Sequence, residues 1–227
     1  MKKALNPYTG MIVAVGIKKG GTGKSMIALN IAPEINPDVF YDTDDTSSIS
    51  TFNSFRPEGK RWNVIRLTDD MEGVTNRFIT ELVAAKEQGK TVLVDCGGFD
   101  SALTRAAVGA ADLIISPFID DPSEILGLQK FSEVLEQISK DMGEKKIAHV
   151  LLNKVHPQRT NFTDVDTFIS QFDNLVRFDT AIPTDKTLPA RFGEGMGIVE
   201  LVATRHGRAG NAMRSLFLDM RTAIEKV

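Results

Sequence analysis

The stretch AVGIKKGGTGKS, residues 14–25, decides how the rest of this sequence is interpreted. A short apolar run precedes it and the apolar run SMIALNIA follows, so a buried strand, a glycine-rich turn and a helix are expected in that order. The last three residues, G-K-S, are typical of a phosphate-binding loop. The strict pattern G-x-x-x-x-G-K-[ST], however, requires a glycine where this chain has Lys18.

The residues of this turn have the chemistry that a phosphate requires. Three glycines let the backbone N–H groups curl around phosphate oxygens where side chains would collide, and the start of the following helix adds its positive dipole end. Lys24 is expected to reach the β- and γ-phosphates, and Ser25 to offer its hydroxyl to magnesium. The alternative, a glycine-rich turn with chance lysines, does not explain why strand, turn and helix are in register.

The chain of 227 residues has the composition of one globular domain, 42% hydrophobic and 25% charged. We expect a single domain over residues 1–227, with 1–10 as a short lead-in. No apolar run approaches the roughly 20 residues of a membrane span, and no apolar block of a signal peptide follows the first lysines. One cysteine, Cys96, excludes an intramolecular disulfide and favours a cytoplasmic location, with a small buried filler as its expected role.

Short apolar runs alternate with longer amphipathic stretches along the chain. Five runs are predicted strands: residues 11–17, 39–43, 91–96, 112–118 and 147–153. Apolar residues at helical spacing between them predict core-facing helices, first Val74, Phe78, Ile79, Leu82 and Val83, then Ile125, Leu128, Phe131, Leu135 and Ile138. Pro33 is expected to stop the first helix.

This alternation predicts an α/β fold, a single doubly wound and mostly parallel sheet with helices on both faces. The strands are apolar throughout rather than alternating, which is typical of strands covered on both sides. In such sheets ligands bind beyond the carboxyl ends of the strands. Polar residues at those ends are therefore the candidate functional residues.

The segment KGGTGKS, residues 19–25, resembles the deviant Walker A motif K-G-G-x-G-K-[ST] of the ParA/MinD family of ATPases. The resemblance is closest to small plasmid-partition ParA proteins without an N-terminal DNA-binding extension, and it implies a P-loop NTPase fold with ATP and Mg2+ as cofactors. In that family the first lysine of the motif crosses a dimer interface to the partner's nucleotide, which assigns this role to Lys19. The expected nucleotide contacts are Lys19, Gly20, Gly21, Thr22, Gly23, Lys24, Ser25 and Met26.

Carboxylates follow the second predicted strand in VFYDTDDTSS, residues 39–48. A carboxylate near the γ-phosphate can polarise a water or hold one bound to magnesium, although a charged turn has the same composition. The segment resembles the family's D-x-D-P-Q, in which the second aspartate orients the attacking water. Asp42 and Asp44 match, whereas Asp45 and Thr46 replace the Pro and Gln. The resemblance thus makes Asp44 catalytic together with Lys19 and Lys24, and the missing residues make slow hydrolysis an expectation.

A third carboxylate, Asp95, ends the strand in TVLVDCGGFDS and has the place of a Walker B aspartate, which binds magnesium through water. The expected metal set is Ser25, Asp42 and Asp95. The segment resembles the D-x-G-G-x-D-S form of small ParA proteins, with Asp100 as its last aspartate. Its two glycines are expected to let the next loop pass close to the γ-phosphate.

The remaining family-like positions concern the base. LLNKVH ends a strand with Asn153, and His156 occupies the place of the aspartate in the guanine-reading N-K-x-D pattern, which disfavours guanine. By resemblance Asn153, together with Pro183 and Asp185 of AIPTD, borders adenine.

The C-terminal segment is basic. Residues 201–227 contain five Lys or Arg against two Asp or Glu, in a chain of net charge -3. ParA relatives bind DNA without sequence preference through a basic face of the ATP dimer, and Arg205, Arg208 and Arg214 are the candidates here. An ordinary solvated helix fits the same residues equally well. The apolar stripe of this helix is expected to pack in the core rather than lie on a membrane.

Three functions follow as hypotheses. The first is an ATP-switched partition protein in the cytoplasm, which dimerises on ATP, associates with nucleoid DNA and hydrolyses ATP when a ParB-like or centromere-binding adaptor stimulates it. The second is a MinD-like module that positions itself on a membrane or scaffold. The third is a metabolic ATPase or ligase on the same fold, for which an iron–sulfur carrier is disfavoured by the single cysteine.

Overall fold

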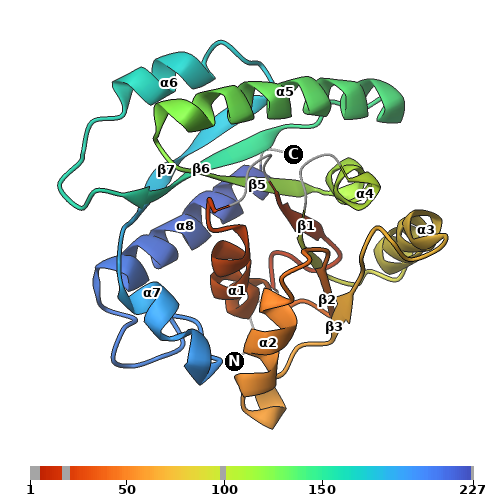
Figure 1. The fold of residues 1–227 in the computed structure, drawn as a ribbon, viewed down its shortest axis with the longest axis horizontal. Helices are drawn as coiled ribbons and strands as arrows, with labels where there is room; N and C mark the ends of the chain where they lie inside the picture. The colour runs from red at the N-terminus through yellow and green to blue at the C-terminus, as the bar shows by residue number, and fades with distance from the viewer. Residues whose placement is uncertain (1–5, 17–20, 98–100, 226–227) are drawn as a thin grey trace.

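A parallel sheet forms the centre of the molecule in this computed structural model, which describes residues 6–16, 21–97 and 101–225 (Figure 1). Within these residues the sheet has seven strands in the order β3-β2-β4-β1-β5-β6-β7, and every pairing is parallel. The strands are β1 (Ile12–Val15), β2 (Val39–Asp42), β3 (Val64–Arg66), β4 (Val92–Asp95), β5 (Leu113–Phe118), β6 (Ala148–Val155) and β7 (Leu175–Pro183). The order reverses at β1, which places a topological switch point beside it.

Helices cover both faces of the sheet, so the predicted doubly wound α/β fold is confirmed. One core lies under α3 (Val74–Glu87), α4 (Ala102–Ala110), α5 (Pro122–Met142) and α6 (Thr163–Ile169). The other lies under α1 (Lys24–Ile35), α2 (Ser48–Phe55), α7 (Thr187–Ala190) and α8 (Arg208–Ile224). Two short 3-10 helices, Glu58–Lys60 and Phe192–Glu194, complete the connections.

The five strands predicted from the sequence are confirmed, whereas the two edge strands were not among them. β3 has only three residues, which is too short for a periodicity to be recognised. β7 mixes buried and exposed positions and includes Arg177 and Asp179, because one side of an edge strand has no neighbouring strand.

The prediction that Pro33 stops the first helix is wrong. α1 continues to Ile35 and ends at Asn36, which adopts the left-handed conformation with φ 50°. A proline removes its own N–H but not those that follow it, and the Asn36 amide still donates to the Ala32 carbonyl at 2.8 Å. The loss of one bond in the last turn is therefore tolerated.

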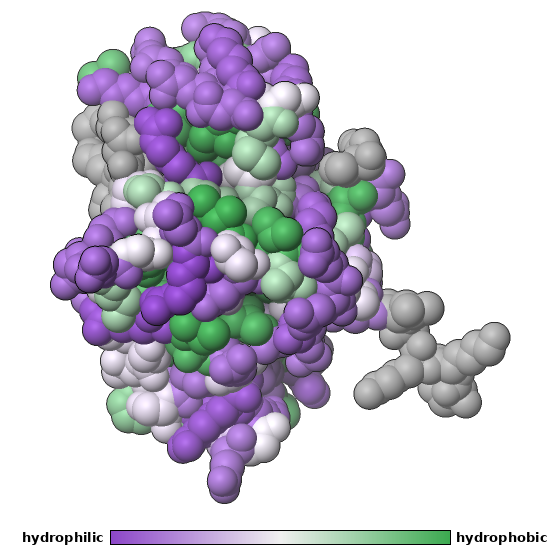
Figure 2. All heavy atoms as spheres, turned by 90° about the vertical axis from the view of Figure 1, so that its right-hand side faces the viewer, coloured by the Kyte–Doolittle hydropathy of each residue, from purple (hydrophilic) through white to green (hydrophobic). Residues whose placement is uncertain are grey.

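The predicted apolar face of α3 is also too wide. Val74, Phe78 and Leu82 are buried, but Ile79 and Val83 are 45% and 52% exposed. Figure 2 shows the side of the molecule on which α3 and α4 lie, where hydrophobic atoms gather among hydrophilic ones. The two side chains follow the helical spacing but lie outside the contact with the sheet, so spacing alone did not separate core from surface.

The other predictions about packing are confirmed. Cys96 is fully buried, and burial raises the pKa of its thiol, as expected of an inert filler. In α8 the stripe of Met213, Leu216, Phe217 and Met220 is buried in the core. In α5 Leu128, Phe131, Leu135 and Ile138 are buried as well. No helix within the described ranges is long and apolar enough to span a bilayer.

Candidate nucleotide-binding site

The candidate site lies where β1, β2, β4 and β6 end at the same edge of the sheet. The register places Asp95 of β4 beside Asp42 of β2 on one side and beside Val15 of β1 on the other. The chain leaves β1 here and returns at Gly21 to begin α1. The parallel pairing thus places the described part of the phosphate loop and the two carboxylates at the same edge of the sheet.

Two glycines of the loop adopt conformations that other residues rarely reach. Gly21 has φ 85° and Gly23 has φ 92°, and α1 begins directly afterwards at Lys24. Within the described residues no N-cap side chain bonds the first amides of α1. These N–H groups therefore remain available to a ligand at the helix N-terminus. The Lys24 side chain is itself 8% exposed. This geometry suits an anion at the helix N-terminus.

The end of β6 holds the loop by two side chains. Asn153 Nδ2 donates to the Thr22 carbonyl at 2.7 Å, and Lys154 Nζ donates to the Gly21 carbonyl at 2.6 Å. A Cβ atom at Gly23 would lie 2.5 Å from Asn153 Nδ2, so a larger residue there would displace the Asn153 amide from the loop. The loop is therefore fixed by residues about 130 positions away in the chain.

Lys154 was not predicted as a site residue, and its backbone is unusual. It adopts φ 55°, which costs a non-glycine residue of the order of 1 kcal/mol, at an irregularity of the β6–β7 pairing. Its carbonyl accepts from the Thr184 hydroxyl at 2.7 Å. Lys154 thereby links the phosphate loop to the loop after β7, a relation that spacing in the sequence could not reveal.

The contacts of Asn153 are with the phosphate loop. Its Oδ1 accepts from the Lys154 amide at 2.9 Å, so both ends of the side-chain amide are engaged. The predicted contact with adenine stays a prediction. Pro183 ends β7, and Asp185 follows with its carboxylate accepting from the amide and hydroxyl of Thr187 at 2.8 and 2.6 Å. Both residues are partly exposed beside this end of the sheet.

Asp95 and Asp42 are buried without the partners that a carboxylate needs. Both side chains are 0% exposed, and among the described residues neither oxygen of Asp95 nor Oδ2 of Asp42 makes a hydrogen bond of good geometry, although the Ser25 hydroxyl lies close to Asp95. Burial raises the pKa of Asp95 to about 8; Asp42 and Asp44 raise it further, while the Ser25 hydroxyl and Lys24 lower it. Burial likewise raises the pKa of Asp42. Such groups are costly unless a cation or proton accompanies them.

A magnesium ion fits these residues. The described residues contain no group of three or more His, Cys, Asp or Glu that could enclose a metal, so an all-protein cage is absent from this part of the chain. Magnesium in phosphate-loop sites takes one or two carboxylates or hydroxyls and completes its shell with water and phosphate. Ser25, Asp42 and Asp95 supply that donor set, and the orphaned oxygens are the observation that supports it.

Asp44 lies in the turn between β2 and α2. Its Oδ1 accepts from the amide and hydroxyl of Thr46 at 2.9 and 2.6 Å, and its own amide donates to Asp42 Oδ1 at 3.3 Å. The two aspartates are therefore coupled through the backbone. Thr46, which stands where the family has glutamine, holds the carboxylate in place through a local turn.

Thr43 is a second residue that sequence reasoning missed. Its hydroxyl donates to the Asp95 carbonyl at 3.0 Å and accepts from the Gly97 amide at 2.9 Å. A Cβ at Gly97 would lie 2.1 Å from the Thr43 carbonyl. Glycine is thus required at 97 by contact with β2, whereas the predicted approach to a γ-phosphate stays a prediction.

Some predicted residues lie outside the described ranges. These are Lys18, Lys19 and Gly20 of the phosphate loop and Gly98 and Asp100 after β4. Met26 lies on the first turn of α1, half-buried, and its carbonyl accepts from Asn30 Nδ2 at 2.8 Å.

The basic cluster lies at the start of α8 and on the segment before it. Arg205, Arg208 and Arg214 are exposed. Arg214 donates to the Arg205 carbonyl and to Asn211, and Arg208 lies near Asp185. Each has a local interaction, and DNA binding by this cluster stays a prediction.

His149 lies away from the candidate site. A cavity of about 700 Å³ lies at the opposite end of the sheet, where β5, β6 and β7 begin, and His149 lines it. The His149 ring stacks on Phe178 with centroids 5.0 Å apart, so His149 takes part in packing at that end of the sheet. His156 is exposed in a turn.

Comparison with solved structures identifies the fold of this chain. Neither a family model nor a curated protein sequence matches the chain. Among solved structures, a Cyanothece McdA variant in complex with ATP is 11% identical with a TM-score of 0.67, covering 96% of this chain and 97% of its own. The septum site-determining protein MinD of Pyrococcus horikoshii with Mg-ADP is 16% identical, with a TM-score of 0.63 and coverages of 91% and 94%.

A putative plasmid partition protein of Borrelia burgdorferi bound to AMPPNP is similar over 95% of this chain and 98% of its own, at 15% identity and a TM-score of 0.59. The chain therefore has the fold of the ParA/MinD-type deviant Walker ATPases.

Proposed function

We propose that the protein is an ATPase that binds MgATP at the carboxyl ends of β1, β2 and β4. The observation that supports this proposal is that Asp42 and Asp95 are buried side by side at the ends of β2 and β4. Within the described residues Asp42 Oδ2 and both Asp95 oxygens lack well-formed hydrogen bonds. Their burial costs free energy that a bound cation would offset. The solved structures of the same fold with ATP, Mg-ADP and AMPPNP support the choice of ligand.

The loop residues would bind and orient the triphosphate. The amides from Gly21 to Ser25 and the Lys24 ammonium neutralise phosphate charge. Ser25, Asp95 and Asp42 would hold magnesium, which supplies electrostatic stabilisation of the transferred phosphoryl group when bound. Asp44, whose Oδ1 is held by Thr46, would orient a water through its second carboxylate oxygen.

The finer proposal is a switch used in DNA partitioning. Lys19 of the K-G-G-x-G-K-S motif would reach the nucleotide of a second copy, so that ATP closes a dimer and hydrolysis opens it. The dimer would present Arg205, Arg208 and Arg214 to DNA, and an adaptor protein would stimulate turnover. The exposure of all three arginines on one segment supports this assignment.

Positioning on a membrane or scaffold is the second candidate, because the MinD structures share the fold. The burial of the apolar stripe of α8 disfavours this helix as a membrane anchor. Co-sedimentation with DNA and with liposomes, each with ATP and with ADP, distinguishes the two. ATP-dependent binding to DNA but not to liposomes is expected, and binding to liposomes alone would overturn the partition proposal.

Lys19→Ala tests the switch. The variant should retain nucleotide binding, because Lys24 and the loop amides remain, yet lose the ATP-dependent dimer and hydrolysis. Light scattering with ATP and with ADP measures the oligomer, and phosphate release measures turnover. Normal hydrolysis by a monomeric Lys19→Ala variant would contradict the cross-subunit role.

A further inference from the structure

The two edge strands of the sheet differ in length and therefore in how readily another strand could pair with them. β3 has three residues, whereas β7 has nine. An edge strand presents unpaired backbone N–H and C=O groups, and natural proteins protect such edges by making them short, by bulges or by charged side chains. Shortness protects β3, so β7 requires another device.

β7 contains a large bulge at its centre. Val150 of β6 pairs with Arg177, but Leu152 pairs with Ala181, so one residue of β6 is opposite three of β7. The three residues are Phe178, Asp179 and Thr180. Their backbone groups leave the regular β6 ladder and need other partners if they are not to remain open.

Arg177 supplies partners for the carbonyls of the bulge. Its Nη1 donates to the Phe178 carbonyl at 2.7 Å and to that of Asp179 at 3.3 Å. The guanidinium is held by Asp166 of α6 through Nε at 2.5 Å and Nη2 at 3.4 Å. The Arg177 side chain is 17% exposed, so it lies against the strand rather than in solvent.

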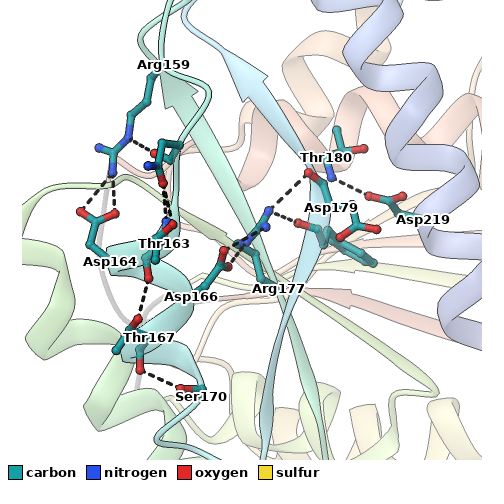
Figure 3. A network of polar contacts seen from close by, with 12 residues as sticks. Arg159, Thr163, Asp164, Asp166, Thr167, Ser170, Arg177, Asp179, Thr180 and Asp219 are labelled. Carbon is teal, nitrogen blue, oxygen red and sulfur yellow. Dashed lines mark hydrogen bonds and ion pairs between the residues drawn. The ribbon is translucent and has the colours of Figure 1, made fainter.

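Asp219 of α8 supplies the partner for an amide of the bulge. Its Oδ2 accepts from the Thr180 N–H at 2.8 Å. Figure 3 shows the two interactions converging on β7, with Arg177 and Asp166 on the α6 side and Asp219 on the α8 side. Asp219 of α8 thus bonds the backbone of β7 directly, whereas Asp166 of α6 holds the Arg177 side chain that does so.

We propose that Arg177 and Asp219 form a clamp that closes the edge of β7 against pairing with the β7 strand of a second copy. A second copy is the relevant partner because an edge strand is complementary to itself about a two-fold axis. With the clamp in place, assembly is left to other faces of the molecule. Without it, the bulge carbonyls and the Thr180 amide become available for strand pairing.

The test is the self-association of the nucleotide-free protein, measured by analytical ultracentrifugation over a range of concentrations. The double variant Arg177→Met with Asp219→Ala should self-associate at least ten times more tightly than the wild type. Asp219→Asn should remain like the wild type, because the asparagine carbonyl can still accept from Thr180. No nucleotide is added, so the result is independent of the proposed function.

Arg159→Met is the matched control. Arg159 also forms an ion pair with an aspartate of α6, Asp164, but no hydrogen bond to β7 is recorded for it within the described residues (Figure 3). It should leave self-association unchanged. Equal association of this variant and the double variant would overturn the proposal, as would a double variant with native circular dichroism that stays monomeric.

Two further measurements keep the proposal testable if the double variant folds poorly. Adding Val176→Lys places a charge on the exposed start of β7, where Val176 is 47% exposed, and should restore the monomer. In Asp219→Ala alone, hydrogen exchange of the Thr180 amide should accelerate at least tenfold in dilute solution. An unchanged exchange rate would show that Asp219 does not protect this amide.

Discussion

Charged groups lie both around the phosphate loop and on the basic segment at the start of α8, but the two sets differ in burial. At the loop, Asp95 is fully buried, and among the described residues its carboxylate makes no hydrogen bond of good geometry. At the basic segment, Arg205 and Arg214 are exposed and Arg214 bonds to its own chain. Burying an unpaired charge costs several kcal/mol of folding free energy, which a bound ligand can offset. An exposed arginine costs little. Burial without partners is thus the stronger sign of function.

The largest expected effect is on the loop itself. Lys24→Ala removes an ammonium that is close enough to Asp95 to lower the pKa of that carboxyl, and ATP affinity should fall at least about 100-fold because the charge-assisted contacts to phosphate are lost. Titration calorimetry with MgATP measures this. Lys130→Ala, on an exposed position of α5, is the control and should bind like the wild type. An affinity retained in Lys24→Ala would make the loop a structural turn.

Asp95→Asn tests the cost of the buried charge through pH. The folded pKa of Asp95 is about 8 against 3.8 as its ordinary value, so the folded state holds a proton that the unfolded state releases. The stability of the ligand-free protein should therefore fall as pH rises from about 4 to 8. Asp95→Asn should remove this loss and be more stable than the wild type at pH 8, on the order of a few kcal/mol.

Thermal melts at pH 5 and pH 8 without nucleotide or magnesium measure the difference. Asp173→Asn is the control, because that carboxylate is 81% exposed and should leave the pH dependence intact. If Asp95→Asn melted with the same pH dependence as the wild type, the charge of Asp95 would not be the costly group.

A smaller effect is expected from Lys154→Met. The substitution removes the bond to the Gly21 carbonyl but keeps the length of the side chain. The loop should therefore become less ordered, while the groups that bind phosphate remain. ATP should bind about ten times more weakly, in keeping with roughly 1.5–3 kcal/mol for a hydrogen bond to a charged group. Lys145→Met, whose ammonium pairs with exposed Asp173, is the matched control. Equal affinities in the two variants would remove Lys154 from the site.

The smallest effect at the site is expected from the basic segment. Replacing Arg205, Arg208 and Arg214 by Gln should change ATP binding little, because all three arginines are exposed and only Arg208 lies near an expected nucleotide contact, Asp185. Binding to DNA should weaken and lose part of its salt dependence. Unchanged DNA binding in this triple variant would show that the basic segment is an ordinary solvated surface.

The sequence predicted those parts of the molecule that are local. The K-G-G-x-G-K-S loop, the strand that ends in Asp95 and the doubly wound sheet each depend on neighbouring residues or on a simple period, and of these the sheet is confirmed. Thr43 and Lys154 could not be predicted. Their roles arise from strand ends that are distant in the chain and meet only when the sheet forms.

Pro33 and Ile79 show the opposite limit. A proline usually ends a helix, yet α1 continues past Pro33. An apolar residue at helical spacing is usually buried, yet Ile79 is exposed. The bulge of β7 has no local signal either, because Asp219, which accepts from the Thr180 amide, and Asp166, which holds Arg177, come from two different helices.

The most direct test of the central claim is calorimetric titration of the wild-type protein with ATP, with and without Mg2+. The structure predicts saturable binding to a single site, weakened at least tenfold when magnesium is removed, and no magnesium dependence in Asp95→Asn. A folded wild-type protein that binds no ATP at millimolar concentration, or binds it equally well without magnesium, would contradict the account.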